Sequence, residues 1–99
     1  MSVYVIAQRT EVRDPEAFAK YLQEVPPIVF SYGGKYHAYE APIEVLEGDW
    51  QPMALIIVEF ETLEQAHTCY NSPEYAPYKE LRHKATSHDL IIVPGAPSS

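Results

Sequence analysis

The sequence has little of what marks a disulfide-stabilised, membrane-spanning or secreted protein. Of its 99 residues only Cys69 is a cysteine, so no internal disulfide can form and a reducing, cytoplasmic compartment is expected. The longest uncharged apolar run, residues 53–58, is far shorter than the roughly 20 residues of a membrane span, so no membrane partner is expected. The residues after Met1 also lack the basic, apolar and small-residue order of a secretory signal.

Basic residues are scarce as well. Lys and Arg number 7 against 14 Asp and Glu, which gives a formal net charge of −7. Because nucleic-acid affinity depends on clustered positive charge, a nucleic-acid partner is not expected. We interpret the acidity as a contribution to solubility.

Ligand patterns for metals and cofactors are missing too. There is no His-x-x-x-His or Cys-x-x-Cys pair, and His67 and His83 fall in different predicted helices, so neither a metal nor haem is expected. The glycine pair at 33–34 forms a turn rather than a phosphate-binding loop. Residues 87–89 read Ser-His-Asp, the residue types of a catalytic triad. Neighbours on a strand point to opposite faces, however, so His88 is excluded as a triad member.

The distribution of hydrophobic residues and capping residues predicts the secondary structure. Strands are expected where apolar residues alternate or form short runs, at residues 3–12, 35–39, 53–60 and 86–93. Pro42 interrupts the chain before a short apolar segment at 43–46, so this hairpin is expected to be irregular and to lie at a sheet edge.

Three segments carry helix-start signals: Asp-Pro-Glu at 14–16, a capping box at 62–65, and Ser-Pro at 72–73. The prolines at 26–27 are expected to break or kink the first helix, because proline cannot donate a backbone hydrogen bond. A short further piece then continues to the glycine pair at 33–34.

The resulting order, β-α-β-β-α-β, predicts an α+β, ferredoxin-like fold with an antiparallel four-stranded sheet and helices on one face only. We expect one domain over residues 1–95 and a disordered tail over 96–99. The uncovered sheet face carries Tyr4, Ile6, Leu55 and Ile57, which is too apolar to stay in water. Packing against the same face of a second copy predicts a homodimer, with a small-molecule cavity between the two sheets.

Several motifs together resemble a known family. They are Asp14-Pro-Glu16, Tyr21, Gly33-Gly34, Leu46-Glu-Gly-Asp-Trp50, Glu59-Phe60, Tyr70, Ser72-Pro-Glu-Tyr75, Arg82 and Gly95. Over essentially the whole chain the sequence resembles the DUF1330 family, which has no known function and falls within the dimeric α/β-barrel superfamily. The resemblance implies a homodimer whose sheets face each other around a central pocket. Related families include cofactor-free monooxygenases, lactone isomerases and haem-dependent enzymes, so the fold does not select a function.

One segment departs from the family pattern. Members tend to have an aliphatic residue and then Arg-Gly-Gly in the hairpin before Leu46. The aligned positions here are His37 and then Tyr39, Glu40 and Ala41. If that arginine binds an anionic ligand in relatives, this chain lacks the charge that does so.

Three residues are candidates for acid, base or orienting roles. Glu59 is predicted to lie on the uncovered sheet face, where desolvation would raise its pKa and suit it to general-base catalysis; the alternative is a solvated or ion-paired carboxylate. His37 could transfer protons near neutral pH, or be a half-exposed edge histidine. Arg82 could bind a substrate carboxylate, or form a structural ion pair with the acidic loop at 47–49.

Aromatic residues are the candidates for ligand binding. Tyr4, Tyr39, Trp50 and Tyr75 could line a pocket, or simply pack in the core and loops. The functional hypothesis is a small enzyme that needs no cofactor and acts on a small apolar or aromatic molecule in a pocket of the dimer. The alternative is a dimeric module without catalysis that binds a ligand or another protein.

Overall fold

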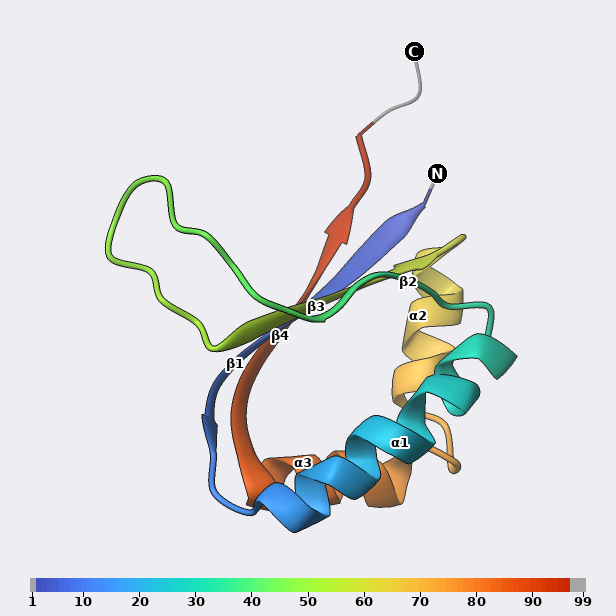
Figure 1. Cartoon of the computed structure of the whole chain (residues 1–99). Helices are drawn as coiled ribbons and strands as arrows, with labels where there is room; N and C mark the ends of the chain where they lie inside the picture. The colour runs from blue at the N-terminus through green and yellow to red at the C-terminus, as the bar shows by residue number, and fades with distance from the viewer. Residues whose placement is uncertain (1, 97–99) are drawn as a thin grey trace.

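The computed structural model describes residues 2–96. The elements in chain order are β1 (Val3–Val12), α1 (Pro15–Ser31), β2 (Lys35–Ala41), β3 (Ala54–Phe60), α2 (Leu63–Tyr70), α3 (Ala76–Ala85) and β4 (Thr86–Pro94). The strands form one antiparallel sheet in the order β2-β3-β1-β4, and all three helices lie on the same side of it (Figure 1). The predicted ferredoxin-like fold is confirmed, with its second helix divided into α2 and α3.

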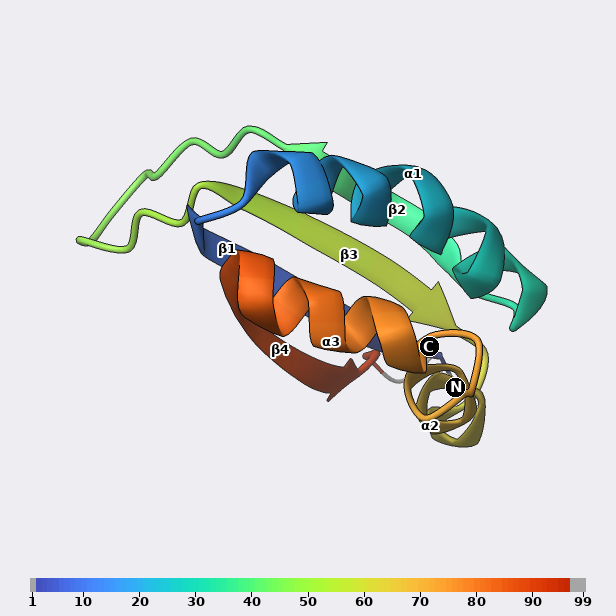
Figure 2. The ribbon, with the colours of Figure 1, turned by 90° about the horizontal axis from the view of Figure 1, so that it is seen from below.

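The core forms where the helix-facing side of the central strands meets α1. In the β1–β3 pair Val3 lies opposite Phe60 and Val5 opposite Val58. Val3, Val58 and Phe60 are buried together with Phe18 of α1. Helices α1 and α3 pack side by side across this face, and α2 lies at the end of the sheet (Figure 2). We call this covered side of the sheet the inner face.

Helix α1 begins as predicted but does not end where its prolines suggested. The Asp14 carboxylate accepts a hydrogen bond from the backbone N–H of Ala17 at 3.1 Å. The helix then continues without interruption through Pro26 and Pro27, so the predicted break is wrong. Pro26 removes the helical hydrogen bond to the Leu22 carbonyl, and the Tyr39 hydroxyl replaces it by donating to that carbonyl at 2.6 Å.

The β2 edge strand is irregular, as predicted, and longer than expected. Its pairing with β3 shifts register twice, once on each side of Ala38. Glu40 has a φ of 52°, in the left-handed region that glycine adopts most readily. The family resemblance aligns this position with a glycine of relatives. Here the Glu40 carboxylate forms an ion pair with Arg9, which offsets the cost of the unusual backbone.

Residues 42–53 connect β2 to β3 and form an extended arm. The short apolar segment at 43–46, expected to belong to an irregular hairpin, lies in this arm and makes no sheet pairing. The arm projects on the side of the sheet away from the helices (Figure 1). Leu46, Trp50 and Met53 are exposed on it, and the Trp50 indole N–H donates to the Gln8 side chain at 2.6 Å.

No helix of residues 2–96 covers the second side of the sheet, which we call the outer face (Figure 1). By the strand register it carries Tyr4, Ile6, Leu55, Ile57, Ile91 and Val93. Ile91 is 54% exposed and Val93 38% exposed. The apolar face predicted from the sequence is therefore present.

Two further details concern the chain ends and helix α3. This helix begins at Ala76 rather than at Pro73, because residues 73–75 form a turn before it. Of the predicted tail at 96–99, only Ala96 belongs to the described residues. Within residues 2–96, no helix has the length and apolar character needed to span a membrane.

Candidate functional site

A cavity of about 440 Å³ lies between the inner face of the sheet and the helices. Apolar side chains of β1, β3 and β4 form its floor: Val5, Ala7, Ile56, Val58, Leu90 and Ile92. This cavity is inside one copy of the chain, beneath α1 and α2, with Arg82 contributed by α3. The sequence prediction had instead placed a cavity between the outer faces of two copies, and that second space stays a prediction.

Two buried tyrosines form a hydroxyl pair at the cavity. The Tyr21 and Tyr75 hydroxyl oxygens lie 2.6 Å apart, and their rings meet edge to face at 6.3 Å between centroids. Burial, reinforced by the neighbouring Tyr75, raises the pKa of Tyr21 well above its ordinary value. Tyr21 is therefore uncharged at neutral pH, and the pair places two hydroxyl groups at the cavity.

The motif at residues 72–75 explains how Tyr75 reaches the cavity. The buried Ser72 hydroxyl accepts a hydrogen bond from the Tyr75 backbone N–H at 3.2 Å and fixes the turn before α3. Tyr75 at the end of this turn is 6% exposed and points inward. The Ser-Pro-Glu-Tyr sequence thus has a structural role that positions a cavity residue.

Tyr39 also lines the cavity, at a more exposed position. Its ring packs edge to face on Tyr36 at 5.1 Å between centroids, and its hydroxyl is held by the Leu22 carbonyl. The structure therefore brings two of the predicted aromatic ligand-binding residues, Tyr39 and Tyr75, to one cavity.

Arg82 is the charged group of the cavity. It lies in the last turn of α3 and is 3% exposed. It forms no ion pair within residues 2–96, and its Nε atom has no hydrogen-bond partner there. Burial lowers its pKa and the Tyr75 and Tyr21 hydroxyls raise it, with a net increase, so the guanidinium stays charged. The alternative structural pair with the acidic loop at 47–49 is not formed.

His88 joins the cavity from β4, although the sequence analysis excluded it as a triad member. The Thr86 hydroxyl donates its single hydrogen to the Arg82 carbonyl at 2.8 Å, and lies 2.6 Å from His88 Nδ1. Nδ1 must therefore carry the hydrogen, which leaves Nε2 as an acceptor. Burial, with the positive charges of Arg82 and Arg9, lowers the pKa of His88 to about 4, so the ring is neutral.

A signal in the sequence could have identified His88. On β4 it shares one face with Thr86, Leu90 and Ile92, and the latter two are apolar. A histidine on the apolar side of a strand is a candidate cavity residue whether or not its neighbours complete a triad. The strand geometry that excludes a triad concerns only the contacts of His88 with Ser87 and Asp89, and not its place in a cavity.

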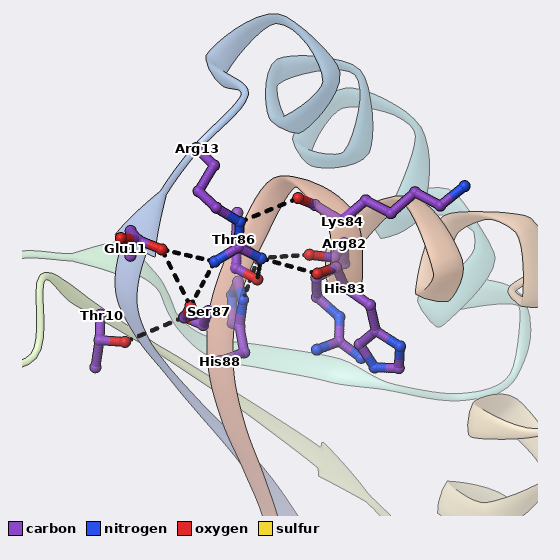
Figure 3. Close-up of polar contacts among 9 residues, drawn as sticks. All are labelled: Thr10, Glu11, Arg13, Arg82, His83, Lys84, Thr86, Ser87 and His88. Carbon is purple, nitrogen blue, oxygen red and sulfur yellow. Dashed lines mark hydrogen bonds and ion pairs between the residues drawn. The ribbon is translucent and has the colours of Figure 1, made fainter.

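Arg13 anchors the segment that carries Arg82 and His88, a role that no sequence pattern indicated. Figure 3 shows its side chain reaching from the end of β1 to the junction of α3 and β4. Its guanidinium donates to the backbone carbonyls of His83 at 2.9 Å and Thr86 at 2.7 Å, and to Ser87 Oγ at 2.7 Å. These bonds satisfy carbonyls at the helix end and fix where Arg82 and Thr86 point.

The other predicted site residues lie on the outer face, away from the cavity. The Glu59 carboxylate and His37 Nε2 are 2.6 Å apart, and the Tyr4 ring lies 6.0 Å from the His37 ring between centroids. Hydrogen bonds from Ser2 and His37 lower the pKa of Glu59, whereas the sequence analysis expected it to be raised. Solvated and paired, Glu59 is a poor base; catalytic roles for it and His37 stay predictions. Trp50 lies on the arm.

The comparison with protein families gives a match over almost the whole chain. The profile of DUF1330, described as a domain of unknown function, matches residues 2–96. Comparison with curated proteins gives no significant match.

Solved structures of similar fold come from several bacteria. A protein of unknown function from Rhodopseudomonas palustris superposes with a TM-score of 0.77 at 19% identity, covering 98% of this chain and 84% of that one. A cofactor-independent oxygenase, SnoaB from Streptomyces nogalater, gives 0.71 at 9% identity, covering 98% and 95%. A dimeric protein of unknown function with a ferredoxin-like fold from Bacteroides fragilis gives 0.59 at 14% identity, covering 95% and 96%. At these identities the likeness establishes the fold alone.

Proposed function

Because the chain belongs to the DUF1330 family, to which no function is assigned, we propose its function from the cavity itself. The protein binds a small aromatic or apolar organic molecule between the inner face of the sheet and the helices. The observation that carries this proposal is the cavity of about 440 Å³, whose walls are mostly apolar and whose few polar groups converge. Small-molecule sites typically have volumes of roughly 300–1,000 Å³ and this kind of lining.

A second proposal, that the protein is an enzyme without a cofactor, is supported by the polar groups in the cavity. His88 offers a neutral ring nitrogen that can accept a proton, and Arg82 offers a positive charge beside two hydroxyls. The fold likeness to a cofactor-independent oxygenase agrees with this proposal. In this proposal Arg82 keeps the orienting role expected from the sequence, and His88 is a further proton acceptor beside the predicted His37 and Glu59.

We further propose that two copies pack through their outer faces. The apolar residues of the outer face support this, since monomeric proteins rarely leave such a surface in water. The arm at 42–53 supports it too, because its exposed Leu46 and Trp50 extend on that same side. In this assembly the dimer stabilises the sheet while each copy keeps its own cavity. The alternative predicted from the sequence, a dimeric module without catalysis, would have this same architecture. It differs from the proposed enzyme only in catalysing no reaction.

The proposed location is the cytoplasm. The single cysteine supports it, because Cys69 is buried as a free thiol in the core cluster. Burial raises the pKa of this thiol to about 11, so it stays protonated at neutral pH.

A thermal-shift screen with neutral and charged aromatic compounds tests ligand binding. We expect binders to raise the melting temperature of the wild-type protein. At a ligand concentration 100 times Kd, the free energy of unfolding increases by about 2.7 kcal/mol. Ala7→Phe places a ring into the cavity from β1 and is expected to abolish the shift. Ala19→Phe adds the same ring to an exposed position of α1 and serves as the matched control.

The same screen identifies a failure of the proposal. A shift that persists in folded Ala7→Phe protein would place the ligand outside the cavity. If Ala7→Phe does not fold, Ala7→Leu removes less of the volume and should weaken binding in proportion. A wild-type protein that no compound stabilises would contradict the proposal outright.

A further inference from the structure

We propose that Arg82 is an anion-binding group and that the ligand is a small organic acid. Its aromatic or apolar body would fill the cavity, and its carboxylate would lie against the Arg82 guanidinium and the Tyr21–Tyr75 hydroxyl pair. This inference rests on the proposed function, because it names the ligand class for the same cavity.

Arg82 differs from the other two arginines of the sequence in its burial and its partners. Arg9 forms an ion pair with Glu40, and Arg13 forms one with Glu11 at 2.6 Å. Both of these are more exposed than Arg82, which is 3% exposed and has no carboxylate partner within residues 2–96. A buried charge without a counter-ion is costly, so the most buried arginine is the one expected to need a partner.

Hydrogen-bond donors are in excess over acceptors around Arg82 and the tyrosine pair. A guanidinium has five N–H donors and no acceptor. The Tyr75 hydroxyl is one hydrogen-bond partner of Arg82, and the buried Nε donor has no partner among the described residues. In the Tyr21–Tyr75 pair one hydroxyl donates to the other, and the hydrogen of the second has no acceptor in the described structure. A carboxylate offers only acceptors and can bind a guanidinium through two parallel hydrogen bonds, so it complements this set.

The size and lining of the cavity favour a ligand with an apolar body. A volume of about 440 Å³ far exceeds the roughly 30 Å³ of a single water, and a small inorganic anion would leave the apolar floor empty. Val58, Leu90 and Ile92 on that floor require apolar atoms from the ligand. An acid with an aromatic or apolar body satisfies both the floor and Arg82.

Calorimetric titration with two matched pairs of probes tests the inference: benzoate with benzamide, and 2-naphthoate with 2-naphthamide. Each pair keeps the ring and changes only the charge. We expect the wild-type protein at pH 7 to bind the acids at least about tenfold more tightly than the amides. Arg82→Met, which keeps side-chain length without charge, is expected to lose this preference and still bind the amides.

Two further variants serve as controls. Lys84→Met removes the same charge from the same helix at an exposed position, and should leave the preference unchanged. Arg82→Met is also expected to leave the melting temperature without ligand close to that of the wild-type protein, because no carboxylate partner among the described residues is left unpaired. A purely structural Arg82 would instead lower it. If Arg82→Met does not fold, Tyr21→Phe removes one hydroxyl of the pair beside Arg82 and should reduce the preference by several-fold.

The outcomes separate this inference from the proposed function. Equal binding of acids and amides, or a preference that survives in Arg82→Met, would overturn the inference while the cavity remains a binding site. If neither probe pair binds and the wider thermal-shift screen is also negative, both fail. Selective loss of the acid preference in Arg82→Met supports both.

Discussion

The two faces of one sheet are both apolar, yet they are completed in different ways. The inner face is covered by helices of the same chain, which bury Val58 and Phe60 and leave a cavity over the strands. The outer face presents Ile57 and Ile91 with nothing from the described residues over them except the arm beside it. Polar groups differ as well. Among the described residues Arg82 on the inner side has no counter-ion, whereas Glu59 on the outer side is paired with His37.

This difference between the two faces shows that an apolar pattern alone does not locate a binding or catalytic site. Glu59 is unusual as a carboxylate on an apolar strand, but hydrogen bonds from its neighbours satisfy that carboxylate. Arg82 is buried, and among the described residues it has no carboxylate partner and its Nε has no hydrogen-bond partner. What indicates function here is the unsatisfied polar group, not the surprising one.

The largest expected effect is on the inner face. Val58→Asp places a carboxylate at a position that is 6% exposed in the core. We expect it to lower the free energy of unfolding by about 4 kcal/mol or more, enough to unfold most of the protein. Loss of the cooperative thermal transition measures this. A folded Val58→Asp protein would mean that the inner face is less tightly packed than described.

Ile57, the residue before Val58 on β3, points to the other face, and the same change there is expected to prevent dimer formation instead. Ile57→Asp puts a charge on the outer face, where two copies are proposed to meet. We expect a folded monomer, with dimer affinity lowered by 100-fold or more, equivalent to about 3 kcal/mol. Sedimentation at micromolar concentration checks the mass. A wild-type protein that is itself monomeric would contradict the dimer.

A smaller effect concerns pH and His88. Burial and the charges of Arg82, Arg9 and His83 outweigh the opposite influence of Asp89, and lower the pKa of His88 from 6.5 to about 4. Between these values the unfolded chain binds a proton that the folded chain does not, so stability falls as the pH drops through this window. We expect a loss of about 1–2 kcal/mol, since the ring keeps part of its hydration.

Denaturant unfolding at pH 7, 5.5 and 4 measures this loss. His88→Gln should flatten the curve in that range, because its side chain does not titrate. His83→Gln removes an exposed histidine on α3 and should leave most of the slope in place. Equal slopes for His88→Gln and the wild-type protein would contradict the shift.

The smallest effect is expected at Glu59. Because its carboxylate is solvated and paired at the sheet surface, Glu59→Gln should leave both the melting temperature and ligand binding in the cavity close to those of the wild-type protein. A clear loss of turnover or binding in a folded Glu59→Gln protein would restore Glu59 as a site residue and would favour a space between two sheets.

Much of the fold could be predicted because local signals agreed with one another. The alternation on β1, the Asp14 cap and the capping box at Thr62 each specified an element that the structure contains. The site was harder, because cavity residues come from α1, α3, β2 and β4 and meet only in three dimensions. Nothing local to Arg82 indicates that its charge has no partner. Likewise, Arg13 reaches carbonyls about 70 residues away in the chain.

Pro26 has a consequence that reaches beyond helix α1. By withholding a hydrogen from the Leu22 carbonyl, it creates an acceptor on the inner side of the helix, and the Tyr39 phenol of the edge strand uses it. Proline and tyrosine therefore form one unit, although they lie 13 positions apart. A relative in which position 26 regains an N–H no longer has a vacant acceptor for that phenol. Substitutions at these two positions are thus expected to be inherited together, as a linked trait of the lineage rather than as independent drift.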